Sequence, residues 1–95
     1  IVLTLDGANR LIEKRIISIG ILNSSLVHPR EVFADAITDR AASIVVIHNH
    51  PSGTLQPSDA DIEITNRLSG SGKLLGITLL DHLIITKTAY MSILK

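Results

Sequence analysis

The stretch that decides the fold is Ser43-Ile44-Val45-Val46-Ile47, which runs directly into His48-Asn49-His50-Pro51-Ser52-Gly53. The first part is a short apolar run rich in β-branched residues, which is typical of a buried central strand. Proline and glycine then recur as far as Pro57, which predicts a loop over residues 49–57. Ligands of α/β proteins are commonly held where a strand ends at such a loop, so this stretch indicates both architecture and chemistry.

A helical pattern precedes this strand. It follows His28-Pro29, and its apolar residues share one predicted face, at Val32, Phe33, Ala36 and Ile37. Glu31 in the first turn and Arg40 near the end suit the helix dipole.

A second helix is predicted after the loop, from about Ser58 to about Gly70. Gly70-Ser71-Gly72 is expected to end it, because glycine favours helix termination. The apolar face of this helix would carry Ile62, Ile64, Thr65 and Leu68.

The remaining apolar segments predict strands. Ile1–Leu5 and Leu11–Leu22 form a hairpin around the turn Asp6-Gly7-Ala8-Asn9, and Asn23-Ser24-Ser25 ends the second strand. Two further strands are expected, over Leu79–Thr86 and Tyr90–Leu94. The order β-β-α-β-α-β-β predicts an α/β class with a mixed sheet.

Composition limits the functions open to the chain. Its 95 residues fit one domain, and 45% of them are hydrophobic, with Phe33 and Tyr90 as the only aromatic residues and both expected in the core. The net charge is +0 and the basic residues are scattered, which argues against nucleic-acid binding by this domain alone. The absence of cysteine excludes disulfides and thiolate ligands, and it suits a cytoplasmic protein. No apolar run is long enough to cross a membrane.

Three side chains form a candidate metal site. Residues two apart on an extended chain point the same way, so His48 and His50 can converge on one ion. Asp61 lies in the first turn of the second predicted helix, and two histidines with one carboxylate and one open position suit catalytic Zn²⁺. A plainer interpretation stays open, in which Ser58-x-x-Asp61 is a capping box and the histidines are incidental.

Other polar residues near this stretch have both structural and functional interpretations. Asn49 and Ser52 are expected to fix the loop through hydrogen bonds to the backbone, with substrate contact as the alternative. Asp81 and His82 must point to opposite faces of their strand. A buried, hydrogen-bonded pair is the favoured interpretation, and support of a metal-bound imidazole is the alternative.

The pattern His48-Asn49-His50-Pro51 followed by Ser58-Asp59-Ala60-Asp61 resembles the JAMM (MPN-plus) metalloprotease motif. The wider sequence resembles one branch of that family, the RadC proteins, which are commonly labelled DNA repair proteins. The stretches that carry the resemblance also include Asn9-Arg10-Leu11-Ile12, His28-Pro29-Arg30-Glu31-Val32-Phe33 and Leu79-Leu80-Asp81-His82-Leu83-Ile84-Ile85, so it covers residues 1–95.

The resemblance implies a cytidine-deaminase-like, three-layer α/β/α domain with a mixed sheet. It implies that His48, His50 and Asp61 bind zinc, and that Ser58 hydrogen-bonds the developing oxyanion or the water. The family also uses a glutamate as general base, just upstream of the first strand. None of Glu13, Glu31 and Glu63 matches that position, so we expect residues 1–95 to be an N-terminally truncated domain that binds metal and hydrolyses poorly.

Two functional hypotheses follow. The first is a zinc-dependent hydrolase domain of the JAMM type, in which metal-activated water cleaves a peptide or isopeptide bond in a peptide or protein substrate. The second is a non-catalytic metal-binding interaction module in a protein that carries the DNA-repair label. A DNA-binding domain is a third interpretation, and the neutral charge and scarcity of aromatic residues disfavour it.

Overall fold

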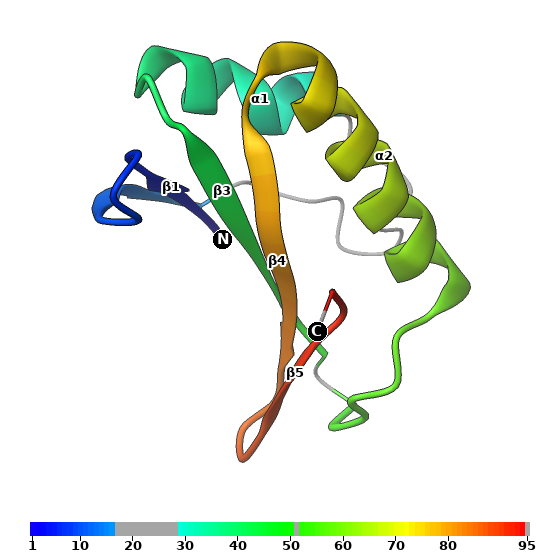
Figure 1. Cartoon of the computed structure of the whole chain (residues 1–95). Coiled ribbons are helices and arrows are strands. Elements are labelled where there is room, and N and C mark those ends of the chain that lie inside the picture. Colours follow the sequence, from blue (N-terminus) through cyan, green and yellow to red (C-terminus); the bar gives the residue numbers. More distant parts are fainter. Residues whose placement is uncertain (17–28, 51, 95) are drawn as a thin grey trace.

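The structure, a computed structural model, describes residues 1–16, 29–50 and 52–94. The elements occur in the predicted order (Figure 1). They are β1 (Val2–Leu5), β2 (Leu11–Arg15), α1 (Pro29–Thr38), β3 (Ser43–Asn49), α2 (Asp59–Leu75), β4 (Thr78–Ile85) and β5 (Tyr90–Ser92). Three predicted features lie outside the described residues: the continuation of the second strand to Leu22, the break at Asn23-Ser24-Ser25, and His28.

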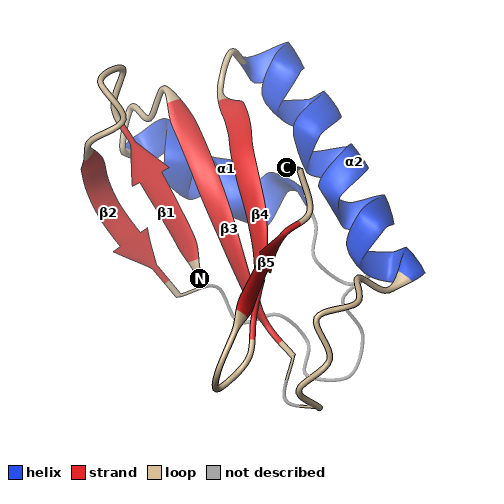
Figure 2. Ribbon diagram, turned by 60° about the horizontal axis from the view of Figure 1, so that its bottom comes forward, coloured by secondary structure: helices blue, strands red, loops and turns tan. Residues whose placement is uncertain are grey.

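The five strands form one open, mixed sheet in the order β2-β1-β3-β4-β5 (Figure 2). The pair β3–β4 is parallel and the other pairs are antiparallel. A parallel pair needs a crossover connection, and α2 supplies it between β3 and β4. The run from Ser43 therefore forms the central strand, as predicted, and extends two residues further to Asn49.

Both helices pack on the same face of this sheet. Phe33 of α1 and Leu68 of α2 belong to one buried cluster with Ile44 and Val46 of β3. Figure 1 shows the two helices next to each other beside β3 and β4. The described residues thus form two layers, and the third layer expected from the resemblance stays a prediction.

Strand β3 carries the chain to the candidate site. Ile44 and Val46 are buried under the helices, whereas Val45 and Ile47 are half-buried on the opposite face. Because side chains alternate along a strand, His48 falls on the helix side. The apolar alternation of the strand therefore decides which way the first histidine points.

Helix α1 differs from its sequence pattern at two positions. Val32, Phe33 and Ala36 are buried as predicted. Ile37 was predicted on the same face but is 55% exposed. Arg40 lies beyond the helix with φ 54°, because the chain turns there toward β3, and the Ala41 N–H donates to the Ala36 carbonyl at 2.9 Å.

Helix α2 is longer than predicted. It continues through Gly70 and Gly72 and ends only at Gly76, whose φ of 74° is the left-handed conformation common at helix ends. A Cβ at Gly72 would collide with the carbonyl oxygen of Ile77. Gly72 is therefore a point of close packing rather than a stop signal.

The outer strands confirm most of the remaining expectations. Strand β2 pairs with β1 as a hairpin, and Asn9 in the connecting turn has φ 62°. Tyr90 was predicted in the core but is 72% exposed, because it lies on the edge strand β5. Ile62 of α2, predicted on the apolar face, is 41% exposed. Neither helix in the described ranges has the length and apolarity that a membrane crossing requires.

Candidate metal centre

The side chains of His48, His50 and Asp61 meet at one end of the sheet. His48 lies near the end of β3, His50 directly follows that strand, and Asp61 is in the first turn of α2. His48 Nδ1 is 3.0 Å from Asp61 Oδ1, and His50 Nε2 is 3.1 Å from Asp61 Oδ2. One donor atom from each residue lies within 4.8 Å of the others, so the three residues that the sequence singled out could hold one metal ion.

Backbone hydrogen bonds place His50 beside His48. The His50 N–H donates to the carbonyl of Ile85 at 3.0 Å, which prolongs the pairing of β3 with β4 by one residue. The Gly53 N–H then donates to the His50 carbonyl at 3.1 Å, and Gly53 has φ 86°. Glycine tolerates this conformation, so the chain can turn back immediately after the second histidine.

A backbone contact orients the ring of His50. Its Nδ1 lies 3.0 Å from the carbonyl oxygen of Thr54, which can only accept a hydrogen bond. Nδ1 can therefore donate to this carbonyl, and Nε2, which lies 3.1 Å from Asp61 Oδ2, is the nitrogen that faces the candidate metal position. A histidine whose second nitrogen donates to a carbonyl is the usual arrangement in metal sites.

Asp61 is held by the capping box, which uses only one of its two carboxylate oxygens. The Ser58 N–H donates to Asp61 Oδ2 at 2.8 Å, and the Asp61 N–H donates to Ser58 Oγ at 3.1 Å. The capping-box interpretation is thus confirmed. Asp61 Oδ1, however, is buried without a hydrogen-bond partner, although His48 Nδ1 is 3.0 Å away. An unsatisfied buried carboxylate oxygen 3.0 Å from an imidazole nitrogen suits a cation, so the residues fit a metal ion.

The charge states required for metal binding are favoured by the surroundings. Burial lowers the pKa of His48, and this effect outweighs the attraction of the Asp61 carboxylate for the imidazolium form. Burial alone would raise the pKa of Asp61, but hydrogen bonding from the Ser58 backbone and the two imidazoles produce a net lowering. Neutral imidazole and ionised carboxylate are the ligand forms of these groups.

His82 of β4 lies next to the candidate metal centre, against His48. It is 2% exposed, and its ring stacks on that of His48 with centroids 6.0 Å apart and planes at 14°. Thr65 Oγ1 donates to the Asp61 carbonyl at 2.8 Å and lies 2.7 Å from His82 Nδ1. Since the hydroxyl proton is already used, His82 Nδ1 carries a proton and donates to Thr65. Among the described residues, His82 therefore reaches His48 by ring stacking and not by a hydrogen bond, and its support of a metal-bound imidazole stays a prediction.

Asp81 points to the opposite face, as the strand alternation predicted. Its Oδ1 accepts a hydrogen bond from the Ser92 hydroxyl of β5. Asp81 and His82 are hydrogen-bonded through the His82 N–H, which donates to Asp81 Oδ1 at 2.8 Å, but their side chains lie on different sides of the sheet and do not form one buried pair.

Burial of His82 predicts a stability change in acid. Burial, assisted by His48, lowers the pKa of His82 from 6.5 to about 4, although Asp61 and Asp81 oppose this. Between these values the unfolded chain takes up a proton that the folded chain does not. The free energy of unfolding of the metal-free protein should therefore fall by about 3 kcal/mol from pH 6.5 to pH 4 through this group.

Urea unfolding at a series of pH values would measure this loss. His82→Phe keeps a ring of similar size and leaves the Thr65 hydroxyl bonded to Asp61, so it is the matched variant. Its stability should fall less between pH 6.5 and pH 4 than that of the parent. Parallel curves for the two proteins would show that His82 does not cause the loss.

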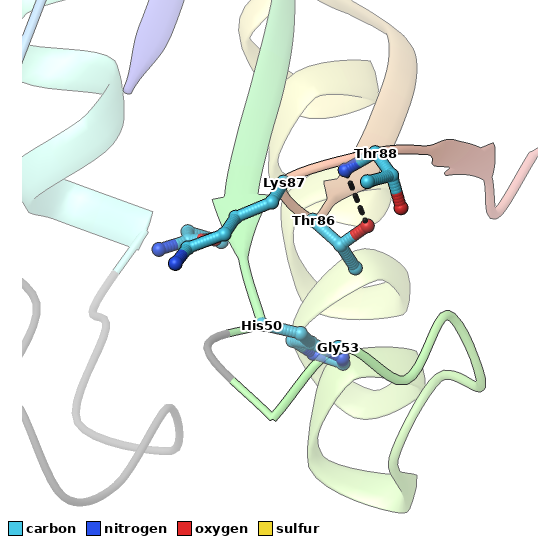
Figure 3. Close-up of a pocket in the computed structure, with 6 residues that line it drawn as sticks. His50, Gly53, Thr86, Lys87 and Thr88 are labelled. Carbon is cyan, nitrogen blue, oxygen red and sulfur yellow. Dashed lines mark hydrogen bonds between the residues drawn. The ribbon is translucent and has the colours of Figure 1, made fainter.

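The centre is accessible from solvent on one side. The side chains of His48 and His50 are 24% and 13% exposed, and Ser58 is exposed at the start of α2. A cavity of about 340 Å³ adjoins His50, between the loop after β3 and the turn before β5 (Figure 3). An open coordination position with room for a ligand is the arrangement of catalytic rather than structural metal sites.

Comparison with known proteins gives a consistent result. A family model described as the RadC-like JAB domain matches residues 1–95. A UPF0758 protein of Methanospirillum hungatei is 66% identical over 87 residues, which cover 92% of this chain and 39% of the relative. UPF0758 proteins of Finegoldia magna and Clostridium perfringens are 54% and 55% identical over 93 residues, or 98% of this chain, and 42% and 41% of those relatives. The chain spans about two fifths of the length of the curated relatives that it matches.

Proposed function

Because the chain belongs to the RadC-like JAB domain family, we propose that His48, His50 and Asp61 bind zinc in a hydrolase that cleaves a peptide or isopeptide bond. The observation that carries this proposal is the buried Asp61 Oδ1, which lacks a hydrogen-bond partner and faces His48 Nδ1 at 3.0 Å. Two nitrogen donors, one carboxylate oxygen and an open position are the donor set of catalytic zinc.

When bound, zinc would lower the pKa of a water molecule to about 7 and polarise the substrate carbonyl. The residues of the chain hold the other groups in place. The Thr54 carbonyl fixes the orientation of His50, and the Ser58 backbone fixes Asp61. Ser58 Oγ accepts a hydrogen bond from the Asp61 N–H, which leaves its own O–H free to donate to an oxygen of the substrate.

The described residues place no glutamate in the candidate metal centre as a general base. Among the described residues, no glutamate joins the group formed by His48, His50 and Asp61. Glu13, Glu31 and Glu63 are exposed on β2, α1 and α2. Since loss of a general base lowers rates by about 10²–10⁴-fold, we expect residues 1–95 alone to bind zinc and hydrolyse slowly.

Hydrolysis of fluorogenic peptide and isopeptide substrates tests this proposal. The assay would compare the zinc-loaded chain, its His48→Ala variant and the whole M. hungatei relative, which is 66% identical over the shared part. We expect zinc-dependent cleavage by the relative and weak or no cleavage by residues 1–95. Equal rates for the chain and the relative would refute the need for a base outside residues 1–95.

The alternative function is a metal-binding interaction module without turnover. The lack of a nearby glutamate among the described residues favours it. If the whole relative binds zinc tightly and cleaves none of the substrates, the module becomes the better proposal. The same centre would then organise the connection between β3 and α2 for a protein partner.

Ser58 provides a separate test of the hydrolase proposal. Ser58→Ala removes the cap acceptor, which should cost about 1 kcal/mol of stability. If its O–H stabilises an oxyanion, kcat of hydrolysis should also fall by about 10²-fold. Ser58→Thr keeps both functions and is the matched control. A loss of stability without a loss of kcat would restrict Ser58 to capping.

Two finer features are also proposed from the family resemblance. One is a second helical layer, which would complete a three-layer, cytidine-deaminase-like sandwich. The half-buried apolar side chains of Leu3, Val45 and Ile47 on the face opposite α1 and α2 support it. A crystal structure of the M. hungatei relative would test it.

The other is a cytoplasmic location, which the cysteine-free sequence suits and which fractionation of the source cells would check.

A further inference from the structure

The cavity beside the metal centre has a distinct chemical character. Its wall is made by two segments, the loop after β3 and the turn between β4 and β5 (Figure 3). Its volume is about 340 Å³, at the lower end of the range for ligand pockets. The lining residues are Asn49, His50, Gly53, Thr86, Lys87 and Thr88. His50 belongs to both the cavity and the metal centre, so an occupant of the cavity lies directly beside the ion.

Both segments are tied down by hydrogen bonds. The His50 N–H donates to Ile85 and thereby links the loop to the end of β4. In the turn, the Thr86 N–H donates to the Ala89 carbonyl at 2.9 Å, and Thr86 Oγ1 accepts from the Ala89 N–H at 3.1 Å. The cavity is thus formed before any ligand arrives, which limits the entropy lost on binding.

The lining of the cavity combines apolar surface with a few polar groups. Lys87 is the only charged side chain in the lining besides the titratable His50, and within the described ranges no ion pair involves it. The Asn49 amide and the Thr88 hydroxyl can also donate. Among the described lining residues there is no carboxylate, and the side chain of Asp61, which contacts His50, is only 1% exposed. A pocket with one free cation and neutral donors is complementary to a singly charged acceptor.

We propose that this cavity is a subsite for the side chain of an aspartate or glutamate next to the bond that is cleaved. The inference rests on the proposed hydrolase function and names its substrate class, namely peptides or isopeptides with an acidic residue flanking the scissile bond. A carboxylate matches the single ammonium of Lys87, whereas doubly charged phosphate groups are usually bound by clusters of arginine.

Binding of short peptides tests the subsite without requiring turnover. The probes are blocked pentapeptides of alanine with glutamate, glutamine or lysine at the centre, titrated into the zinc-loaded chain by calorimetry or NMR. The proteins are the parent, Lys87→Gln and Lys87→Glu. Lys73→Glu is the matched control, because Lys73 is an exposed lysine in the last turn of α2, at the far end from Ser58.

In the parent and in Lys73→Glu, the glutamate peptide should bind about fivefold more tightly than the glutamine peptide, as expected for one partly exposed charge pair. Lys87→Gln should lose this preference, and Lys87→Glu should prefer the lysine peptide. Equal binding of all peptides, or no binding, would overturn the inference. A glutamate preference that persists in Lys87→Glu would also overturn it, because the carboxylate would then be binding the metal.

Hydrolysis of the same peptides by the whole relative is read separately. Charge-dependent binding without cleavage would keep the cavity as a binding site for an acidic side chain and reject the hydrolase. Cleavage that ignores the central residue, together with charge-independent binding, would keep the hydrolase and reject the subsite. The two proposals can therefore fail independently.

Discussion

Asp61→Asn is expected to lower the zinc affinity of the chain by more than about 100-fold while leaving the fold intact. Loss of a group that merely hydrogen-bonds to a metal ligand already costs about 10–100-fold, so loss of a charged ligand should cost more. Asparagine can still accept the Ser58 N–H at the position of Oδ2 and keep the capping box. Its amide nitrogen would replace the spare oxygen that faces His48, and it cannot coordinate a cation.

Competition with a chromophoric chelator measures the affinity, and the visible spectrum of the cobalt-substituted protein reports the ligand set. Asp59→Asn is the matched control, because it removes the same charge from the same helix turn at an exposed position. His48→Ala should behave like Asp61→Asn, with zinc lost after dialysis. If Asp59→Asn weakens zinc binding as much as Asp61→Asn does, general charge rather than coordination explains the effect.

Gly72→Ala is expected to destabilise the fold by about 3 kcal/mol. A Cβ at this position would collide with the carbonyl oxygen of Ile77 and come within 3.4 Å of the Phe33 ring. The Ile77 N–H also donates to the Gly72 carbonyl at 2.9 Å, so the two backbones cannot separate without losing a hydrogen bond. The backbone between α2 and β4 would have to shift. Ile77 in this segment belongs to the same buried cluster as residues of both helices, so the shift would disturb their packing.

Gly70→Ala is the control in the same helix. Nothing lies within 4 Å of a Cβ there, and the residue is exposed. Alanine should therefore stabilise the helix by about 0.5–1 kcal/mol, because it loses less conformational entropy than glycine. Urea unfolding of the two variants should give changes of opposite sign. Equal changes would show that the close contact at Gly72 does not limit packing.

Local chemistry was enough to predict much of this protein. The β-branched run at Ser43 marked the central strand, and the spacing of Ser58 and Asp61 marked the start of α2. The alternation of side chains along an extended chain placed His48 and His50 where they could act together. These features depend on residues that are neighbours in the sequence, and the resemblance to the family rests on the same stretches.

The tertiary structure decided what depends on contacts between distant segments. Glycines at 70 and 72 resemble a helix end, yet α2 continues to Leu75, and residue 72 is glycine because the Ile77 carbonyl leaves no room for a side chain there. Tyr90 is exposed because β5 is an edge strand, which composition cannot show. His82 joins the centre, and Lys87 its neighbouring cavity, only because β4 lies parallel to β3. Sequence spacing describes the ligand set itself, whereas the groups around it are brought there by the pairing of strands.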